Sequence, residues 1–183
     1  LYPWLAWGLG TFSPQMVLWG LVLFSAFGVG LSFACAQELC EREGLSPLVA
    51  LCIPANPGLI SALCILSADP LALGFAMLGL VCWRKGHSKL ALFSFAATAL
   101  CKEAYLLVPL SVALYELFCL GDQKAAWRSI FLPALPLSIW VLWLMFYAKL
   151  PDAVGAWGDL DLPFRGIYHF LGGKPQPVLE GYT

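Results

Sequence analysis

Long runs of apolar residues, separated by short polar segments, make up most of this sequence. The first run, residues 14–36, carries no charged side chain and exceeds the roughly 20 apolar residues that a membrane-spanning helix requires. Further apolar runs predict helices at residues 45–66, 71–83, 90–101, 104–120 and 129–150. The pattern therefore predicts an all-α fold, a polytopic transmembrane helix bundle with short or re-entrant helical hairpins.

Helix-breaking residues interrupt the run at residues 45–66. Pro54, Asn56, Pro57 and Gly58 fall within five positions of one another. Such a cluster ends or kinks a helix, so we expect two short helical pieces here in place of one span.

The polar segments divide the chain into parts. Segments 37–44 and 121–128 predict loops between helices. We expect residues 1–150 to form a transmembrane helical domain and residues 151–183 to form an extracytoplasmic loop. Within that loop, aromatic and aliphatic residues at 159–173 have the spacing of a short helix lying on the membrane surface.

Composition supports the membrane assignment. Of the 183 residues, 61% are hydrophobic and 11% are charged, whereas about 25% are charged in an ordinary globular domain. So few charges exclude a soluble enzyme, and 10 Lys+Arg against 11 Asp+Glu give no basic excess for nucleic acid. We therefore predict an integral membrane protein whose partner is the lipid bilayer, and we expect the chain to be a piece of a longer polytopic protein.

The positions of the basic residues predict the topology. Basic loops at residues 84–89 and 124–128 are expected to be cytoplasmic. One helix over residues 90–120 would be about 46 Å long and would place these loops on opposite sides of the membrane. A hairpin with its apex at Lys102–Glu103 removes the conflict. The same argument places residues 67–69 at a second apex on the non-cytoplasmic side.

These two apices contain the charges nearest to membrane depth, namely Asp69, Lys102 and Glu103. Leaving such a charge unpaired in lipid costs at least ~2.5–3.5 kcal/mol of free energy. The three side chains should therefore face a protein interior or a wet cavity. Lys102 and Asp69 are a candidate ion pair. Purely structural roles remain open. Asp69, followed by Pro70, fits the N-cap of the next helix, and Lys102–Glu103 fits a solvated hairpin tip.

For the other polar residues we expect simpler roles. Glu116 is expected to lie at the membrane interface. Arg165, in the predicted extracytoplasmic loop, is a candidate phosphate ligand or an interfacial anchor. The sequence contains no phosphate-binding loop, zinc motif or nucleophile elbow, so it indicates no metal and no cofactor. The seven cysteines are expected to be small buried hydrophobes: Cys35, Cys40, Cys52, Cys64, Cys82, Cys101 and Cys119.

The order of these features resembles that of the bacterial polytopic glycosyltransferases of the GT-C superfamily. The similarity follows the stretch at residues 44–86, then ALCKEAYLLVPLSVALYEL at residues 99–117 and LDLPFRG at residues 160–166. The family commonly has an S-x-D motif at the position of residues 67–69, and a basic residue followed by Glu at the position of Lys102–Glu103. Both motifs are present here.

The resemblance implies a multi-pass enzyme of the bacterial plasma membrane that takes sugar from a polyprenyl-phosphate-linked donor on the non-cytoplasmic face. It implies that Lys102 holds the leaving phosphate, with Arg165 as a second candidate. Asp69 or Glu103 would then orient Lys102 or bind sugar hydroxyls. The family's acidic catalytic residue in the first outer loop has no counterpart here, so we expect the general base to lie upstream of Leu1.

Two other classes of protein remain open. A transporter or lipid flippase would also have a broken helix, as at residues 54–58, together with charges at membrane depth. A non-catalytic membrane scaffold is the third possibility. An internal inverted repeat of spans would favour the transporter, and an acidic residue in an upstream outer loop would favour the enzyme.

Overall fold

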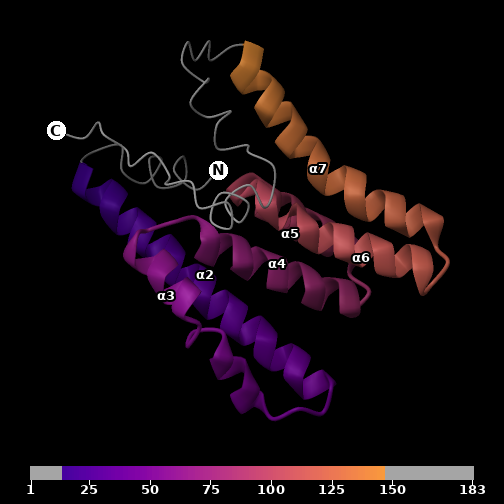
Figure 1. Ribbon diagram of the computed structural model, residues 1–183, viewed down its shortest axis with the longest axis horizontal. Coiled ribbons are helices and arrows are strands. Elements are labelled where there is room, and N and C mark those ends of the chain that lie inside the picture. Colours follow the sequence, from indigo (N-terminus) through magenta and orange to yellow (C-terminus); the bar gives the residue numbers. More distant parts are fainter. Residues whose placement is uncertain (1–13, 147–183) are drawn as a thin grey trace, which may run out of the picture. The chain divides into compact units, whose positions relative to one another are not determined.

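The computed structural model describes residues 14–146, and all the regular structure in that part of the chain is helical (Figure 1). The chain separates into two compact units, Leu1–Val141 and Leu142–Thr183. The helices in chain order are α2 (Pro14–Arg42), η1 (Pro47–Cys52), α3 (Pro57–Cys64), α4 (Asp69–Arg84), α5 (Ser88–Cys101), η2 (Glu103–Leu106), α6 (Leu107–Phe118) and α7 (Gln123–Phe146). The prediction of an all-α protein is confirmed for the described residues. The predicted loop at residues 151–183 lies outside them.

The helix breaks fall where the sequence predicts them. The segment between η1 and α3 contains Asn56, whose Oδ1 accepts the backbone N–H of Gly58 at 2.8 Å and of Leu59 at 3.3 Å. Asn56 is therefore the N-cap of α3, and Pro57 occupies the first helical position, where its missing N–H costs nothing. The second break, at Lys102, has an extended backbone with φ −157° and ψ 121°.

Two predicted loops are wrong, because the helices continue into their polar residues. Helix α2 runs to Arg42, and its last turn has an ion pair of 2.7 Å between Arg42 and Glu38 in the favourable i,i+4 order. Helix α7 begins at Gln123, where Asp122 Oδ1 accepts the N–H of Ala125 at 3.0 Å. Local pairing and capping thus extend both helices beyond their apolar cores.

Glycines allow α2 and α4 to lie in close contact. The position that a Cβ on Gly74 would occupy is 2.7 Å from the carbonyl oxygen of Gly28. A Cβ on Gly28 would overlap the carbonyl group of Pro70 and lie 2.5 Å from the backbone nitrogen of Leu71. Small residues at a helix–helix contact bring two backbones together in this way. The first turn of α4 is therefore held directly against the middle of α2.

Helices α4, α5 and α6 share a small hydrophobic core. Its buried residues are Cys82, Ala91, Phe95 and Val112, and Gly79 provides the space for the Phe95 ring. Cys82 is near the end of α4, whereas Ala91 is near the start of α5. Successive helices therefore run in opposite directions, as hairpins do.

One end of the bundle collects the basic loops, and we call it the basic end. Arg84, at the end of α4, forms an ion pair with Glu43 just after α2, and Lys85 lies 3.0 Å from Glu38. The end of α2 therefore lies beside the loop at residues 84–89.

Glu116 connects the second basic segment, residues 124–128 at the start of α7, to the same end. Its side chain accepts hydrogen bonds from Trp83 Nε1 at 2.8 Å and from Ser129 Oγ at 2.7 Å, which joins α4, α6 and α7. Glu116 is only 6% exposed, so its carboxylate is buried among three helices, and its expected position at the membrane interface stays a prediction. The basic segments at residues 84–89 and 124–128 therefore share one end, as the predicted hairpin requires.

The opposite end, which we call the tip end, consists of the two connections at residues 65–68 and 102–106. Lys102 Nζ lies 2.5 Å from Asp69 Oδ1, which joins the two connections. The predicted hairpin with its apex at Lys102–Glu103 is thus confirmed.

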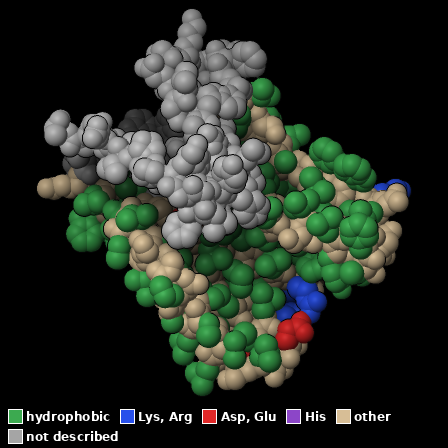
Figure 2. Space-filling model, viewed as in Figure 1, with side chains coloured by type: hydrophobic (Ala, Val, Ile, Leu, Met, Phe, Trp, Pro, Cys, Tyr) green, Lys and Arg blue, Asp and Glu red, His purple; other side chains and the backbone are tan. Residues whose placement is uncertain are grey.

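The surface of the described helices is largely apolar. In the part of the chain that the structure describes, Figure 2 shows hydrophobic side chains spread over the visible face and charged side chains in small groups. Two of the described helices are long and apolar enough to cross a membrane, Gln15–Arg42 and Gln123–Trp143. Helices α5 and α6, with 14 and 12 residues, are only about 21 and 18 Å long.

The expectation that the cysteines are buried is wrong for three of the seven. Cys35 and Cys82 are buried, whereas three others are exposed, namely Cys52, Cys64 and Cys119. The three exposed cysteines have apolar side chains, and the surface of the described helices is itself largely apolar.

Candidate functional site

The centre of the candidate site is the Asp69 carboxylate, which receives a donor on each oxygen. Lys102 Nζ donates to Oδ1 at 2.5 Å, and Ser67 Oγ donates to Oδ2 at 2.9 Å. The backbone N–H of Asp69 in turn donates to Ser67 Oγ at 3.3 Å. The predicted pairing of Lys102 with Asp69 is confirmed, and the S-x-D motif is a local hydrogen-bonded unit.

The start of α4 explains why Asp69 points to Lys102. Ala68 is the N-cap and Asp69 is the first helical residue, so the alternative role of Asp69 as an N-cap is wrong. A carboxylate in the first turn is stabilised by the positive end of the helix dipole. The carboxylate accepts hydrogen bonds from Ser67 and Lys102 and from no backbone N–H of the described residues, so it is directed to the cation.

Lys102 is placed by the end of α5. It is the C-cap of that helix, where a positive charge is favoured, and its extended backbone starts the turn into η2. The side chains of Lys102 and Asp69 are 40% and 25% exposed, so the pair is partly buried. An ammonium group has three N–H donors, and the contact with Asp69 occupies one of them. Lys102 therefore retains donors for a ligand oxygen.

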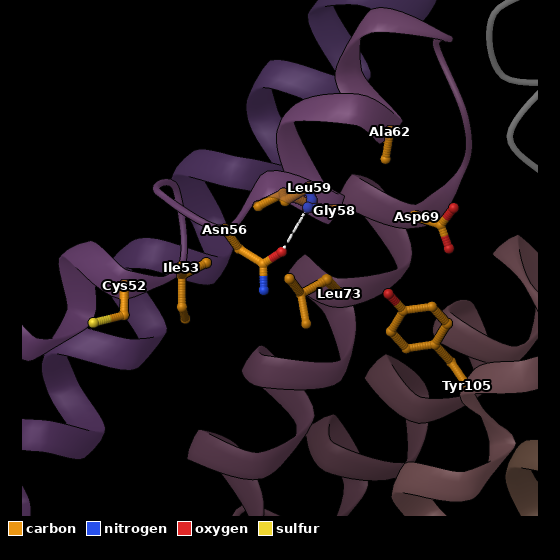
Figure 3. Close-up of a pocket in the computed structure, with 9 residues that line it drawn as sticks. All are labelled: Cys52, Ile53, Asn56, Gly58, Leu59, Ala62, Asp69, Leu73 and Tyr105. Carbon is orange, nitrogen blue, oxygen red and sulfur yellow. Dashed lines mark hydrogen bonds between the residues drawn. The ribbon is translucent and has the colours of Figure 1, made fainter.

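A cavity of about 510 Å³ adjoins this pair (Figure 3). Residues of η1, α3, α4 and η2 line it, so it lies where the broken helix meets the two tip connections. The lining residues are Cys52, Ile53, Asn56, Gly58, Leu59, Ala62, Asp69, Leu73 and Tyr105. Most of the wall is apolar, with polar side chains at Asp69, Tyr105 and Asn56.

Tyr105 is a neutral hydrogen-bond donor in this cavity. Partial burial raises the pKa of its phenol, and the nearby Asp69 carboxylate raises that pKa further. The hydroxyl therefore keeps its proton at neutral pH. It makes no hydrogen bond to any residue in the described part of the chain.

The remaining candidates are not brought into the site. Glu103 is exposed in η2 and forms no ion pair with a described residue. Arg165 lies outside the described residues, as does the expected helix at residues 159–173. Among residues 14–143, no three His, Cys, Asp or Glu side chains form a group that could hold a metal ion.

Sequence reasoning missed two residues that line the cavity, Tyr105 and Asn56. Tyr105 is three residues after Lys102, in the connection that the hairpin argument had already placed near Asp69. Asn56 precedes Pro57 and Gly58, a pattern typical of a helix cap, and was interpreted only as part of a helix break. Attention to polar residues within each predicted apex and break would have found both.

No family model, curated protein or solved structure was found to match this chain. The function is therefore inferred from the site itself. That site combines a cation with free donors, a carboxylate and a mainly apolar cavity. Such a combination can hold a phosphate beside a neutral polar group, with hydrocarbon close by.

Proposed function

We propose that this chain is part of a GT-C-like glycosyltransferase of the bacterial plasma membrane, with several membrane passes. In this proposal the protein transfers a sugar from a polyprenyl-phosphate donor to an acceptor on the non-cytoplasmic face. The observation that carries the proposal is the Asp69–Lys102 pair beside the cavity, at the end of the bundle opposite the basic loops.

The membrane location is supported by the surface of the helices. Large apolar side chains are exposed along the two long helices, including Leu23 and Phe27 on α2 and Phe131 and Ile139 on α7. A helix that is apolar on all sides requires either protein or lipid around it. The gathering of basic loops at one end favours a cytoplasmic position for that end.

The chemistry of sugar transfer accounts for the polar groups at the tip end. The leaving polyprenyl phosphate carries negative charge, which the compact ammonium of Lys102 can approach closely. Asp69 positions Lys102 and provides an acceptor for sugar hydroxyl groups. Glu103 and Arg165 remain additional candidates for binding the substrate, and the general base is proposed to lie upstream of Leu1.

The test is a transfer assay on the full-length protein in bilayer vesicles. With a radiolabelled polyprenyl-phosphate sugar, we expect polyprenyl phosphate to be released and the label to pass to an acceptor. Vesicles without protein provide the background. A protein that moves the intact labelled lipid between leaflets without cleaving the sugar–phosphate bond would be a flippase. A protein that does neither would be a scaffold. Either outcome contradicts the transferase.

A further inference from the structure

Two hydrogen-bond donors in the cavity are not used by the described part of the protein. One is the Tyr105 hydroxyl, and the other is the side-chain amide nitrogen of Asn56 (Figure 3). The orientation of the amide is fixed because Asn56 Oδ1 accepts two backbone N–H groups at the start of α3. Nδ2 is therefore left as a donor with no competing acceptor role.

These donors lie on different parts of the cavity wall. Tyr105 is at the tip end, close enough to Asp69 for the carboxylate to act on its phenol. Asn56 is at the other end of α3, and the eight residues of that helix account for about 12 Å between Asn56 and the tip end. Asn56 is exposed, so its side-chain amide is accessible to a ligand that enters the cavity.

Most of the remaining lining of the cavity is apolar. Leu59, Ala62 and Leu73 contribute hydrocarbon there, and no charged side chain other than Asp69 lines the cavity. A ligand that suits this lining has oxygen acceptors at separate positions and C–H surface between them. A sugar ring has this arrangement, whereas a hydrocarbon chain offers no oxygen to Asn56. Lys102 lies next to the cavity, beyond Asp69, where a phosphate attached to that sugar would meet it.

We infer that this cavity is the sugar subsite, in which Asn56 Nδ2 donates a hydrogen bond to a hydroxyl oxygen of the sugar and Tyr105 donates to an oxygen nearer the phosphate. The identity of the ligand as a sugar phosphate rests on the proposed function. Asn56 is then a specificity-determining residue. It favours a sugar that carries the hydroxyl it binds, because a sugar without that hydroxyl would not form this hydrogen bond.

The test measures equilibrium binding to the purified full-length protein. The probes are radiolabelled glucose, galactose and mannose 1-phosphates, with inorganic phosphate as the reference ligand. We expect the protein to bind at least one hexose 1-phosphate more tightly than inorganic phosphate. In Asn56→Ser the binding of that sugar phosphate should weaken roughly threefold to tenfold, the range for one hydrogen bond, while binding of inorganic phosphate stays unchanged.

Serine is the informative substitution because it is also a good N-cap. Asn56→Ser should therefore keep the melting temperature of the wild type, whereas Asn56→Ala, which removes cap and donor together, should lower it. Tyr105→Phe should weaken binding of the sugar phosphate by a similar factor. Its matched control is Tyr115→Phe, which removes an exposed hydroxyl at the basic end and should have no effect.

Three results would overturn the inference. One is that no hexose 1-phosphate binds more tightly than inorganic phosphate. A second is that Asn56→Ser binds the preferred sugar phosphate as tightly as the wild type does. A third is that Asn56→Ser loses affinity for inorganic phosphate by the same factor as for the sugar phosphate. Because the assay measures binding alone, a protein that passes it and transfers no sugar contradicts the proposed function and leaves the sugar subsite standing.

Discussion

Replacement of Lys102 by alanine is expected to reduce sugar transfer by the full-length protein roughly 10²-fold to 10³-fold, the usual cost of removing one group that stabilises charge developing in the transition state. The reason lies in the Asp69–Lys102 pair. The ammonium is held at 2.5 Å from the carboxylate, which fixes its position while leaving donors for a phosphate. Without Lys102, the leaving phosphate would meet the Asp69 carboxylate with no neutralising charge between them.

The measurement is the initial rate of transfer from a labelled polyprenyl-phosphate sugar at saturating acceptor. The matched control is Lys89→Ala, which removes an exposed lysine near the start of α5, at the basic end. This control should retain the wild-type rate. Lys102→Arg is not expected to rescue the rate fully, because a planar guanidinium does not replace a compact ammonium. If a folded Lys102→Ala protein transferred sugar at the wild-type rate, Lys102 would not be part of the substrate site.

Replacement of Gly28 by alanine is expected to destabilise the fold, although alanine is the better helix former. The new Cβ would overlap the carbonyl group of Pro70, and backbone atoms of a packed helix cannot move aside as a flexible side chain can. Overpacking of this kind costs about 3 kcal/mol at the upper end of its usual range. Since Pro70 follows Asp69, the displacement of α4 should also disturb the Asp69–Lys102 pair.

Gly30 provides the control for this second prediction. It lies on the same helix, but a Cβ placed there meets no atom within 4 Å. Gly30→Ala should therefore gain the helix propensity of alanine, about 1 kcal/mol, without a clash. Thermal unfolding of both variants in the same detergent should give midpoints that differ by roughly 6–12 °C, with Gly28→Ala the lower. Equal midpoints would show that α2 and α4 do not pack as described.

The sequence predicted the helical fold and the two hairpin tips because these depend on local signals. Apolar runs, helix breakers and the distribution of basic residues are each visible without knowledge of the packing. Lys102 interrupts an apolar stretch and Asn56 precedes a proline, so both breaks were found. The pairing of Lys102 with Asp69 followed from the cost of leaving either charge alone at membrane depth.

The features that could not be predicted from the sequence depend on which helices are in contact with one another. Nothing near Glu116 in the sequence indicates that Trp83 and Ser129, from two other helices, donate to its carboxylate. In the same way, the cavity brings Asn56 and Tyr105 into one lining although 49 positions separate them in the sequence. The ends of α2 and α7 were misplaced because an ion pair and a cap extend a helix past its apolar residues.

The most direct test of the central claim, a substrate site at an outward-facing tip end, is cysteine labelling in whole cells. On a background without native cysteines, Glu103→Cys is treated with a thiol reagent that does not cross the membrane, and His87→Cys serves as the control at the basic end. We predict that position 103 reacts from outside, that position 87 reacts only after the membrane is opened, and that added polyprenyl-phosphate sugar slows the reaction at position 103. Reaction of position 103 only from the cytoplasmic side, or at a rate that the sugar lipid does not change, would contradict the account.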